Sequence, residues 1–430
     1  MLNRKTPPIQ AHNGHIEVKE AQEIMLPNGI KLLTINAGTQ EVSRTEFIFN
    51  AGTRFQKKVL TSRGAITMLT EGTATLSSMQ IAEQFDFYGS YVEQTADRDF
   101  GGLTLFSLNK FLPQSLELVE KVLKTPTYPE KEIQTYRVKG KQTLQVELGK
   151  VSTLVRQKFF DTIFGANHPY GEFAQPEDYD KVEQADLLDF QQKHISSTGC
   201  TIFLAGKISD AEVALIEKLF GQEPWGKPHQ TDFSLPSLPQ TFEQKQWVEK
   251  ADAVQSAIRV GRRMFPRTHP DFPGMAVLNT ILGGYFGSRL MKNLREDKGY
   301  TYGVSSGLAP LRESGFWVAG AEVGSEFTLP ALEQIYLEIN RLRTELIPNE
   351  ELSLVRNYLL GEALRTFDGP FATAETITSL YEYNDLDYSF LHNMLHTIHN
   401  ITSKELMELA NKYLNPNDLI ECVAGSVSNI

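Results

Sequence analysis

The chain contains two copies of one long pattern, and this duplication constrains its fold more than any local motif does. Ile202–Ser209 is an apolar run around an Ala-Gly pair, and Glu421–Ser428 repeats it at residue numbers higher by 219. At the same offset, Pro129–Glu132 matches Pro348–Glu351, and each predicts a helix with an N1 proline and an acidic first turn. The repeated unit of about 210 residues has the size of a compact domain.

Periodicity within the first copy predicts both kinds of secondary structure. Strands are expected at 30–35, 45–50 and 102–108, and helices at 79–88, 111–123, 130–164 and 177–194. Ser209 and Glu212 have the spacing of a capping box that starts a further helix. Because strands and helices mix without strict alternation, the sequence predicts an α+β protein of two homologous domains. Each domain is expected to be a mainly antiparallel sheet layered with helices.

Proline content separates the two copies. Residues 221–239 contain four prolines and little periodicity, which is typical of a linker. We therefore predict an N-terminal domain at 1–220, a linker at 221–245 and a C-terminal domain at 246–430.

Charge and cysteine content narrow the class of protein. The formal charge is −11, from 42 basic and 53 acidic residues spread along the chain, so a basic stripe for nucleic acid is missing. Cys200 and Cys422 are too few for a disulfide framework, which fits a reducing compartment. The N-terminus lacks the apolar run of a secretory signal, and no apolar run approaches membrane-span length. We expect a cytoplasmic protein that binds neither nucleic acid nor membrane.

Several short motifs occur in a specific order along the duplicated chain. Leu282–Leu290 is a glycine-rich turn followed by Ser-Arg-Leu, and Leu294–Val304 contains Leu-Arg-Glu and then Gly-x-x-Tyr-x-Val. Supporting matches are Leu26–Gly29, Asn50–Gly52 and the His-Pro-Tyr-Gly run at His168–Gly171. Together they resemble the insulinase-like (inverzincin) metallopeptidases, which include mitochondrial processing peptidase and its bacterial relatives. The resemblance spans essentially the whole chain.

The resemblance implies a zinc motif, His-x-x-Glu-His, in which two histidines one helical turn apart bind the metal and the glutamate polarises a water. Residues 62–73, where the motif should lie, contain no histidine. Alignment on the glycine before the motif puts Thr67, Thr70 and Glu71 at its positions. Alignment on the Gly-Thr pair after it puts Arg63, Ile66 and Thr67 there.

Glu147 stands where the third zinc ligand of the family would be expected. One carboxylate without its histidines is too little for catalytic zinc, because threonine and isoleucine cannot replace imidazole. We therefore expect no metal in this chain, and an exposed helical acid at Glu147.

In the family, the domain without zinc supplies an arginine and a tyrosine to the facing zinc site. The resemblance places these at Arg295 and Tyr302. A guanidinium and a phenol could stabilise the oxyanion of peptide hydrolysis or align the substrate carbonyl. An arginine ending a helix and a tyrosine in a strand would be the purely structural interpretation. Ser288 and Arg289 are expected to be turn and surface residues.

The sequence hypothesis is therefore a zinc-less subunit of a heterodimeric insulinase-like metallopeptidase. Its partner would carry the zinc, the substrate would be a peptide or unfolded protein, and Arg295 and Tyr302 would act in trans. We expect no activity from the chain alone, and a homodimer is possible when the partner is missing. The alternative is a non-catalytic structural or peptide-binding scaffold of the same fold.

Two further clusters of basic side chains allow more than one interpretation. His392, His396 and His399 share one helix face, where they could bind a transition metal or form a polar surface. Arg259, Arg262 and Arg263 form a basic patch that could contact an acidic substrate or partner, or be solvated charge at a strand end.

Overall fold

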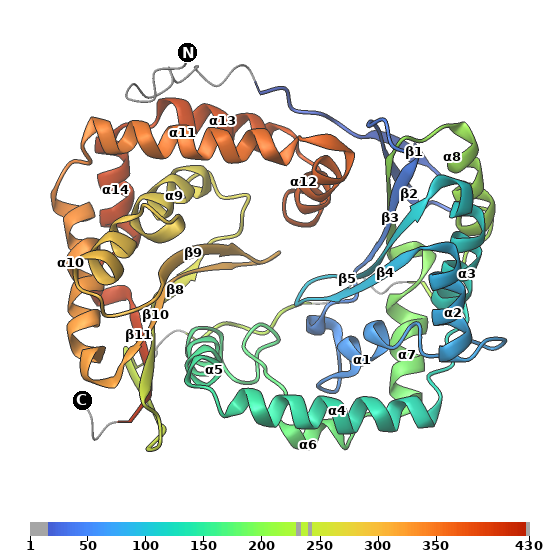
Figure 1. Cartoon of the computed structure of the whole chain (residues 1–430), viewed down its shortest axis with the longest axis horizontal. Coiled ribbons are helices and arrows are strands. Elements are labelled where there is room, and N and C mark those ends of the chain that lie inside the picture. The colour runs from blue at the N-terminus through green and yellow to red at the C-terminus, as the bar shows by residue number, and fades with distance from the viewer. Residues whose placement is uncertain (1–15, 229–233, 240–242, 427–430) are drawn as a thin grey trace, which may run out of the picture.

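Two β-sheets, one in each half of the chain, form the frame of the molecule (Figure 1). The computed structural model describes residues 16–228, 234–239 and 243–426. Within them, the first sheet has the order β1-β2-β6-β3-β5-β4 and the second has the order β7-β11-β8-β10-β9. The strands are β1 (Gln22–Met25), β2 (Lys31–Asn36), β3 (Val42–Phe49), β4 (Tyr91–Ala96), β5 (Gly101–Leu108), β6 (Cys200–Gly206), β7 (Lys245–Glu249), β8 (Gln255–Met264), β9 (Val304–Pro310), β10 (Gly315–Gly324) and β11 (Ile420–Gly425).

The second sheet repeats the arrangement of five strands of the first, which has β1 as an additional edge strand, and this confirms the predicted α+β fold with one sheet per repeat. β6 pairs parallel with β2 and antiparallel with β3, and β11 pairs parallel with β7 and antiparallel with β8. The other strand pairs within the described residues are antiparallel, so each sheet is mixed but mainly antiparallel. The repeated Ala-Gly segments are therefore equivalent inner strands.

Helices cover the outer face of each sheet (Figure 1). The first half contains α1 (Thr61–Thr67), α2 (Ser78–Tyr88), α3 (Leu112–Lys124), α4 (Glu130–Leu148), α5 (Val151–Phe164), α6 (Pro176–Tyr179), α7 (Gln184–His194) and α8 (Asp210–Ile216). The second contains α9 (Phe272–Asn279), α10 (Thr328–Thr344), α11 (Asn349–Thr366), α12 (Gly369–Asn384), α13 (Ser389–Asn400) and α14 (Ser403–Tyr413). π-Helical turns are η4 (Glu217–Gly221), η5 (Thr280–Gly284) and η6 (Met291–Asp297). Short 3-10 turns lie at Thr53–Phe55, Asn109–Phe111, Ser197–Gly199, Ser325–Phe327 and Pro416–Asp418.

The helical predictions need three corrections. The stretch 130–164 is two helices, because Lys150 adopts an extended backbone (φ −95°, ψ 132°) and ends the helical hydrogen bonding after Gly149. The stretch 177–194 is likewise divided into α6 and α7. Pro129 is the extended N-cap residue of α4, one position earlier than expected. The capping box at Ser209 and Glu212 is confirmed, with both of its hydrogen bonds present.

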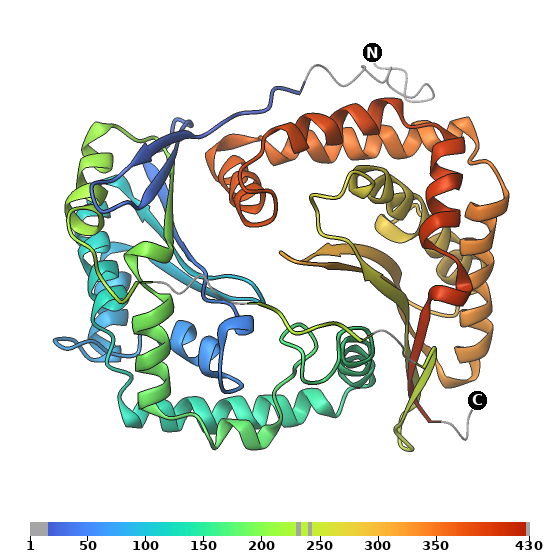
Figure 2. The same cartoon turned by 180° about the vertical axis from the view of Figure 1, so that it is seen from behind.

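Each half contributes one helix to the sheet of the other half (Figures 1 and 2). α5 packs against β8 and β11 of the second sheet, and its buried Phe159 joins an apolar cluster with Ala257 and Cys422. α12 packs against β2 and β6 of the first sheet, where Ile377 shares a cluster with Phe203. Apolar burial at these two contacts stabilises the arrangement of the halves.

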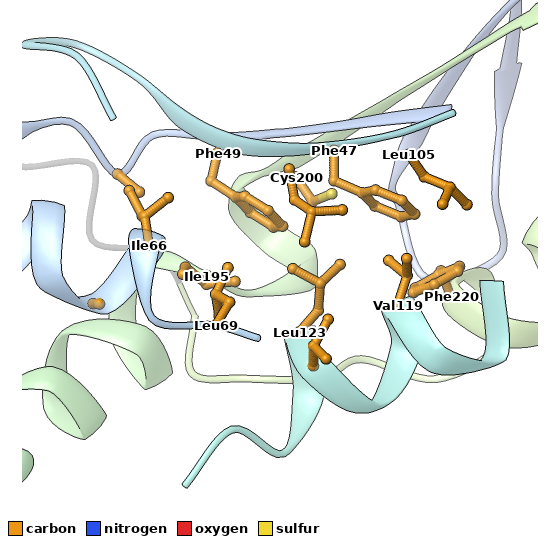
Figure 3. Close-up of a cluster of buried hydrophobic side chains, with 14 of the residues drawn as sticks. Phe47, Phe49, Ile66, Leu69, Leu105, Val119, Leu123, Ile195, Cys200 and Phe220 are labelled. Atoms are coloured by element: carbon orange, nitrogen blue, oxygen red, sulfur yellow. The ribbon is translucent and has the colours of Figure 1, made fainter. Parts of the chain in front are cut away.

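The largest core lies beneath the first sheet (Figure 3). Side chains from β3, β5 and β6 point toward helices α1 and α3, and Phe47 contacts Phe220 with ring centroids 4.7 Å apart. Cys200 is 6% exposed in this core and Cys422 is fully buried in the interdomain cluster, so both thiols pack as small apolar groups.

The linker expected at 221–245 is only partly described. Residues 229–233 and 240–242 lie outside the described residues. Trp225 packs back on the first half, where its backbone carbonyl accepts a hydrogen bond from the Ser197 amide at 2.9 Å. Leu235 and Leu238 contact the cluster around α5. The described parts of this segment therefore run along the junction of the two halves.

Candidate functional site

Helix α1 carries the segment where the zinc motif should lie. Arg63 and Thr67 are one turn apart on it, and Thr67 Oγ1 donates to the Arg63 carbonyl oxygen at 2.7 Å. Because α1 ends at Thr67, Thr70 and Glu71 lie beyond the helix. The side chains of Thr70 and Glu71 each accept a hydrogen bond from a neighbouring side chain, at 3.0 Å and 2.8 Å. None of these groups is an imidazole.

Glu147 lies at the C-terminal end of α4. Its Oε1 accepts a hydrogen bond from Lys150 Nζ at 2.5 Å, and this bond is the largest cause that lowers the pKa of Glu147. Both side chains are exposed to solvent, 40% for Glu147 and 54% for Lys150. Within the described residues, no group of three His, Cys, Asp or Glu side chains could hold a metal ion. The residues at this position therefore do not fit a catalytic zinc.

A cavity of about 750 Å³ lies between α1, α4 and α5, at the junction of the halves. Arg63 and Glu147 line it together, whereas Thr67, Thr70 and Glu71 do not. The other charged residues of its wall are Asp97, Arg98, Arg156, Glu172 and Arg259. Two of the positions that the resemblance assigns to the metal site, Arg63 and Glu147, thus lie in the wall of a cavity that has four arginines.

The predicted Arg295 and Tyr302 both lie at the surface of the second half. Arg295 projects from η6, with its guanidinium 4.8 Å from the ring centroid of Phe286. Tyr302 is 93% exposed in the loop that follows. Gly299, at φ +65°, turns the chain between them, a conformation that side chains rarely adopt.

Hydrogen bonds of Thr301 fix the backbone of the loop that contains Tyr302, although the Tyr302 side chain is exposed. Thr301 Oγ1 donates to the Glu322 carbonyl at 2.7 Å and is also within 2.9 Å of the Gly303 carbonyl. Tyr302 lines a second cavity of about 570 Å³ together with Arg259, and Arg295 is not part of that wall. Arg259 also lines the first cavity, so the two cavities are adjacent.

Ser288 and Arg289 are not the turn and surface residues expected from the sequence. Ser288 is 1% exposed. Arg289 makes a bidentate ion pair with Glu351 of α11, in which Nε donates to Oε1 and Nη2 donates to Oε2, each at 2.8 Å. The planar guanidinium matches both carboxylate oxygens, which ties the start of η6 to α11.

The predicted basic patch is divided by the structure. Arg262 Nη1 donates to the Tyr413 carbonyl at 3.2 Å, and Arg263 Nη2 donates to the Pro239 carbonyl at 2.9 Å. Arg259 faces the two cavities instead. The sequence analysis did not identify Arg98 or Arg156 as candidate site residues. Of the arginines that line a cavity with them, it named Arg259, as part of the basic patch.

The three histidines lie on α13 with exposed side chains, and they belong to no metal-binding group of the described residues. Among the helices described, none is long and apolar enough to cross a membrane.

The repeated sheets, the exchanged helices and the altered metal position define a two-domain peptidase-like protein. The family model described as "Peptidase M16 inactive domain" matches residues 181–359. Curated relatives include an uncharacterized zinc protease, YmxG, of Bacillus subtilis, 23% identical over 70% of this chain and 73% of that protein. The beta subunit of mitochondrial-processing peptidase of Rattus norvegicus is 22% identical over 84% of this chain and 76% of that protein.

Solved structures show the same fold. A peptidase M16 inactive domain from Pseudomonas fluorescens aligns with a TM-score of 0.85 and 22% identity, over 95% of this chain and 98% of that chain. A protease from Helicobacter pylori aligns with a TM-score of 0.85 and 14% identity, over 95% of this chain and 100% of that chain. These matches confirm the resemblance to the insulinase-like (M16) peptidases seen in the sequence.

Proposed function

We propose that this chain is the zinc-less subunit of a heterodimeric insulinase-like metallopeptidase and supplies Arg295 and Tyr302 to the zinc site of its partner. The observation that carries the proposal is the 93% exposure of Tyr302 on a loop anchored by Thr301. The fold makes little use of this phenol, so it is free to contact another molecule. The missing histidines of α1 add support, because the metal would have to come from a second chain.

The chemistry assigned to the pair is electrostatic. Peptide hydrolysis builds negative charge on the substrate carbonyl oxygen, and a guanidinium and a phenol O–H can both donate to that oxygen. The substrate would be an extended or unfolded peptide. The chain would work in the cytoplasm, and alone it would cleave nothing. Without its partner it could form a homodimer.

A scaffold function is the second candidate, and one contact favours it. Arg295 is stacked on Phe286 and does not line the cavity beside Tyr302. If this contact persisted in a complex, the pair would not act on one carbonyl group, and the fold would serve only to hold peptides or neighbouring subunits.

A reconstitution assay separates the two functions. The chain would be mixed with an insulinase-like chain that carries His-x-x-Glu-His, and turnover of an unfolded peptide would be measured. We expect Arg295→Ala and Tyr302→Phe each to lower turnover by about 100-fold or more while the complex still forms. Matched controls are Arg365→Ala and Tyr91→Phe, which alter exposed residues outside both cavities. Unchanged turnover in the two test variants would favour the scaffold.

A further inference from the structure

Three arginines from distant parts of the chain meet in the larger cavity. Arg98 comes from the turn between β4 and β5, Arg156 from α5 and Arg259 from β8. The chain as a whole is acidic, with a formal charge of −11, so a cluster of three arginines is not expected from its overall composition. In the part of the chain that the structure describes, none of the three forms an ion pair.

Arg98 is held in place by groups that leave most of its donors unused. Its Nε donates to the Tyr170 carbonyl oxygen at 3.0 Å. Its guanidinium lies 4.2 Å from the ring centroid of Phe160 and 5.6 Å from that of Phe173. Its two terminal nitrogens have no hydrogen-bond partner among the described residues. A guanidinium fixed in this way loses little side-chain freedom when it binds a ligand.

The charge of Arg156 acts on the guanidinium groups of both Arg98 and Arg259. Burial is the largest cause that lowers the pKa of these two residues, and Arg156 lowers both further. Asp97 and Asp99 act in the opposite direction on Arg98, as does Glu322 on Arg259. Packing α5 on the second sheet brings Arg156 beside Arg259 at a cost in like-charge repulsion. A bound anion would remove that cost.

The carboxylates of the cavity are already hydrogen-bonded to other groups. Asp97 Oδ1 accepts from two backbone amides of its own turn, at 2.7 Å and 2.6 Å. Glu147 is paired with Lys150, and Glu172 accepts a hydrogen bond from Gln56 at 3.0 Å. The charge of Asp97 acts on Arg98, and that of Glu147 on Arg156, without an ion pair between them among the described residues, so guanidinium donors remain available to a ligand.

We propose that Arg98, Arg156 and Arg259 form a carboxylate-binding site that holds an acidic group of a peptide where the family's metal site would stand. The planar fork of a guanidinium matches the two oxygens of a carboxylate, and several such groups can share one anion. Arg259 also lines the neighbouring cavity that contains Tyr302, so one peptide can reach both places. The choice of a peptide as ligand rests on the proposed function, but the site itself needs no partner chain.

The test measures peptide binding to the full chain alone, by fluorescence anisotropy of labelled peptides that share one uncharged sequence. One peptide has a free C-terminal carboxylate, a second has a C-terminal amide and one internal glutamate, and a third has the amide and glutamine in place of that glutamate. We expect at least one carboxylate peptide to bind about tenfold or more tightly than the neutral peptide. Whichever of the two carboxylate peptides binds more tightly shows whether the site prefers a C-terminal or a side-chain carboxylate.

Substitutions then assign the binding to the arginines. Arg156→Gln changes an exposed side chain of α5, and Arg259→Gln changes one that is half-buried. We expect each to lower the affinity for the carboxylate peptide about tenfold and to leave the neutral peptide unaffected. Arg365→Gln, which removes the same charge from the surface of α11, should change neither.

Equal binding of the three peptides, no binding of any of them, or the same loss in Arg365→Gln as in Arg156→Gln would overturn the site. Because no zinc-bearing partner is present, these outcomes are independent of the reconstitution assay.

Discussion

The backbone amide of Arg312 donates a hydrogen bond to Asp99 Oδ2 at 2.9 Å, which joins the β9–β10 hairpin of the second half to the β4–β5 turn of the first. Asp99 is 1% exposed. Its Oδ1 accepts from the Tyr170 hydroxyl at 2.6 Å and lies 3.2 Å from Arg54 Nη1. One buried carboxylate therefore connects three segments across the junction of the halves.

Asp99→Asn should loosen this junction. The amide keeps the shape of the side chain but loses the charge that the Arg54 guanidinium faces, and hydrogen bonds to charged groups contribute about 1.5–3 kcal/mol. We expect a free energy of unfolding lower by about 2 kcal/mol, measured by urea denaturation. Asp252→Asn, at an 82% exposed side chain, should change it by less than about 0.5 kcal/mol. Equal effects would mean that Asp99 does not join the halves.

Glu382 on α12 makes the stability of the same junction depend on pH. Burial is the largest cause that raises the pKa of its carboxyl group to about 8, from an ordinary 4.5, and the charges of Asp97, Glu46 and Asp99 add to it. The positive charge of Arg267 opposes the shift. The folded chain thus holds a proton that the unfolded chain has released between these two pH values.

Because the folded state binds the extra proton, this group's contribution to stability falls as the pH rises from about 4.5 to about 8, and changes no further above that. Thermal unfolding across this range should show a falling midpoint. Glu382→Gln resembles the protonated form and should flatten the dependence, whereas Glu408→Gln on the surface of α14 should keep it. An unchanged slope in Glu382→Gln would assign the pH dependence to another group.

The duplication was predictable because local patterns survive in both copies. Ile202–Ser209 and Glu421–Ser428 keep the apolar residues of an inner strand, and each follows an amphipathic helix. The end of α4 was not predictable, because a helical pattern continues through Gly149 and only the extended backbone of Lys150 interrupts it. The exchange of α5 and α12 between the sheets was also missed, since periodicity marks a buried face without naming its neighbour.

The candidate site could likewise be predicted from the sequence only in part. Arg295 and Tyr302 could be identified because they lie within a local motif. Arg98 and Arg156 lie in no motif. They share a cavity only because α5, a helix of the first half, packs on the sheet of the second half. Such a site depends on tertiary packing, which neither composition nor spacing reports.

The ion pair between Arg289 and Glu351 should order the segment that leads to Tyr302. Arg289→Lys keeps the charge but replaces a planar fork by a single ammonium group, which cannot make both 2.8 Å contacts. We expect faster hydrogen exchange of backbone amides in residues 291–303, with little change in the first half of the chain. Lys292→Arg, at the next exposed basic position along η6, is the control. Equal exchange in both variants would show that the ion pair does not order the loop.

Two helical glycines should respond in opposite ways to substitution by alanine. Gly140 lies inside α4, where an added Cβ would meet the ring of Tyr179 at 2.1 Å. Gly361 lies inside α11, where an added Cβ would have no heavy atom within 4 Å. Alanine is favoured over glycine in a helix by about 1 kcal/mol, so Gly361→Ala should raise the free energy of unfolding by about that amount.

At Gly140 the same gain in helix propensity is opposed by a steric clash. Tyr179 is 8% exposed and packs against Tyr136, so its ring cannot move away without disturbing the contact between α4 and α6. Overpacking of this kind typically costs about 1–3 kcal/mol. Gly140→Ala should therefore lower the stability, and the double variant Gly140→Ala/Tyr179→Leu should recover part of the loss. Urea denaturation of both glycine variants gives the comparison, and stabilisation by Gly140→Ala would contradict the close packing of α4 on α6.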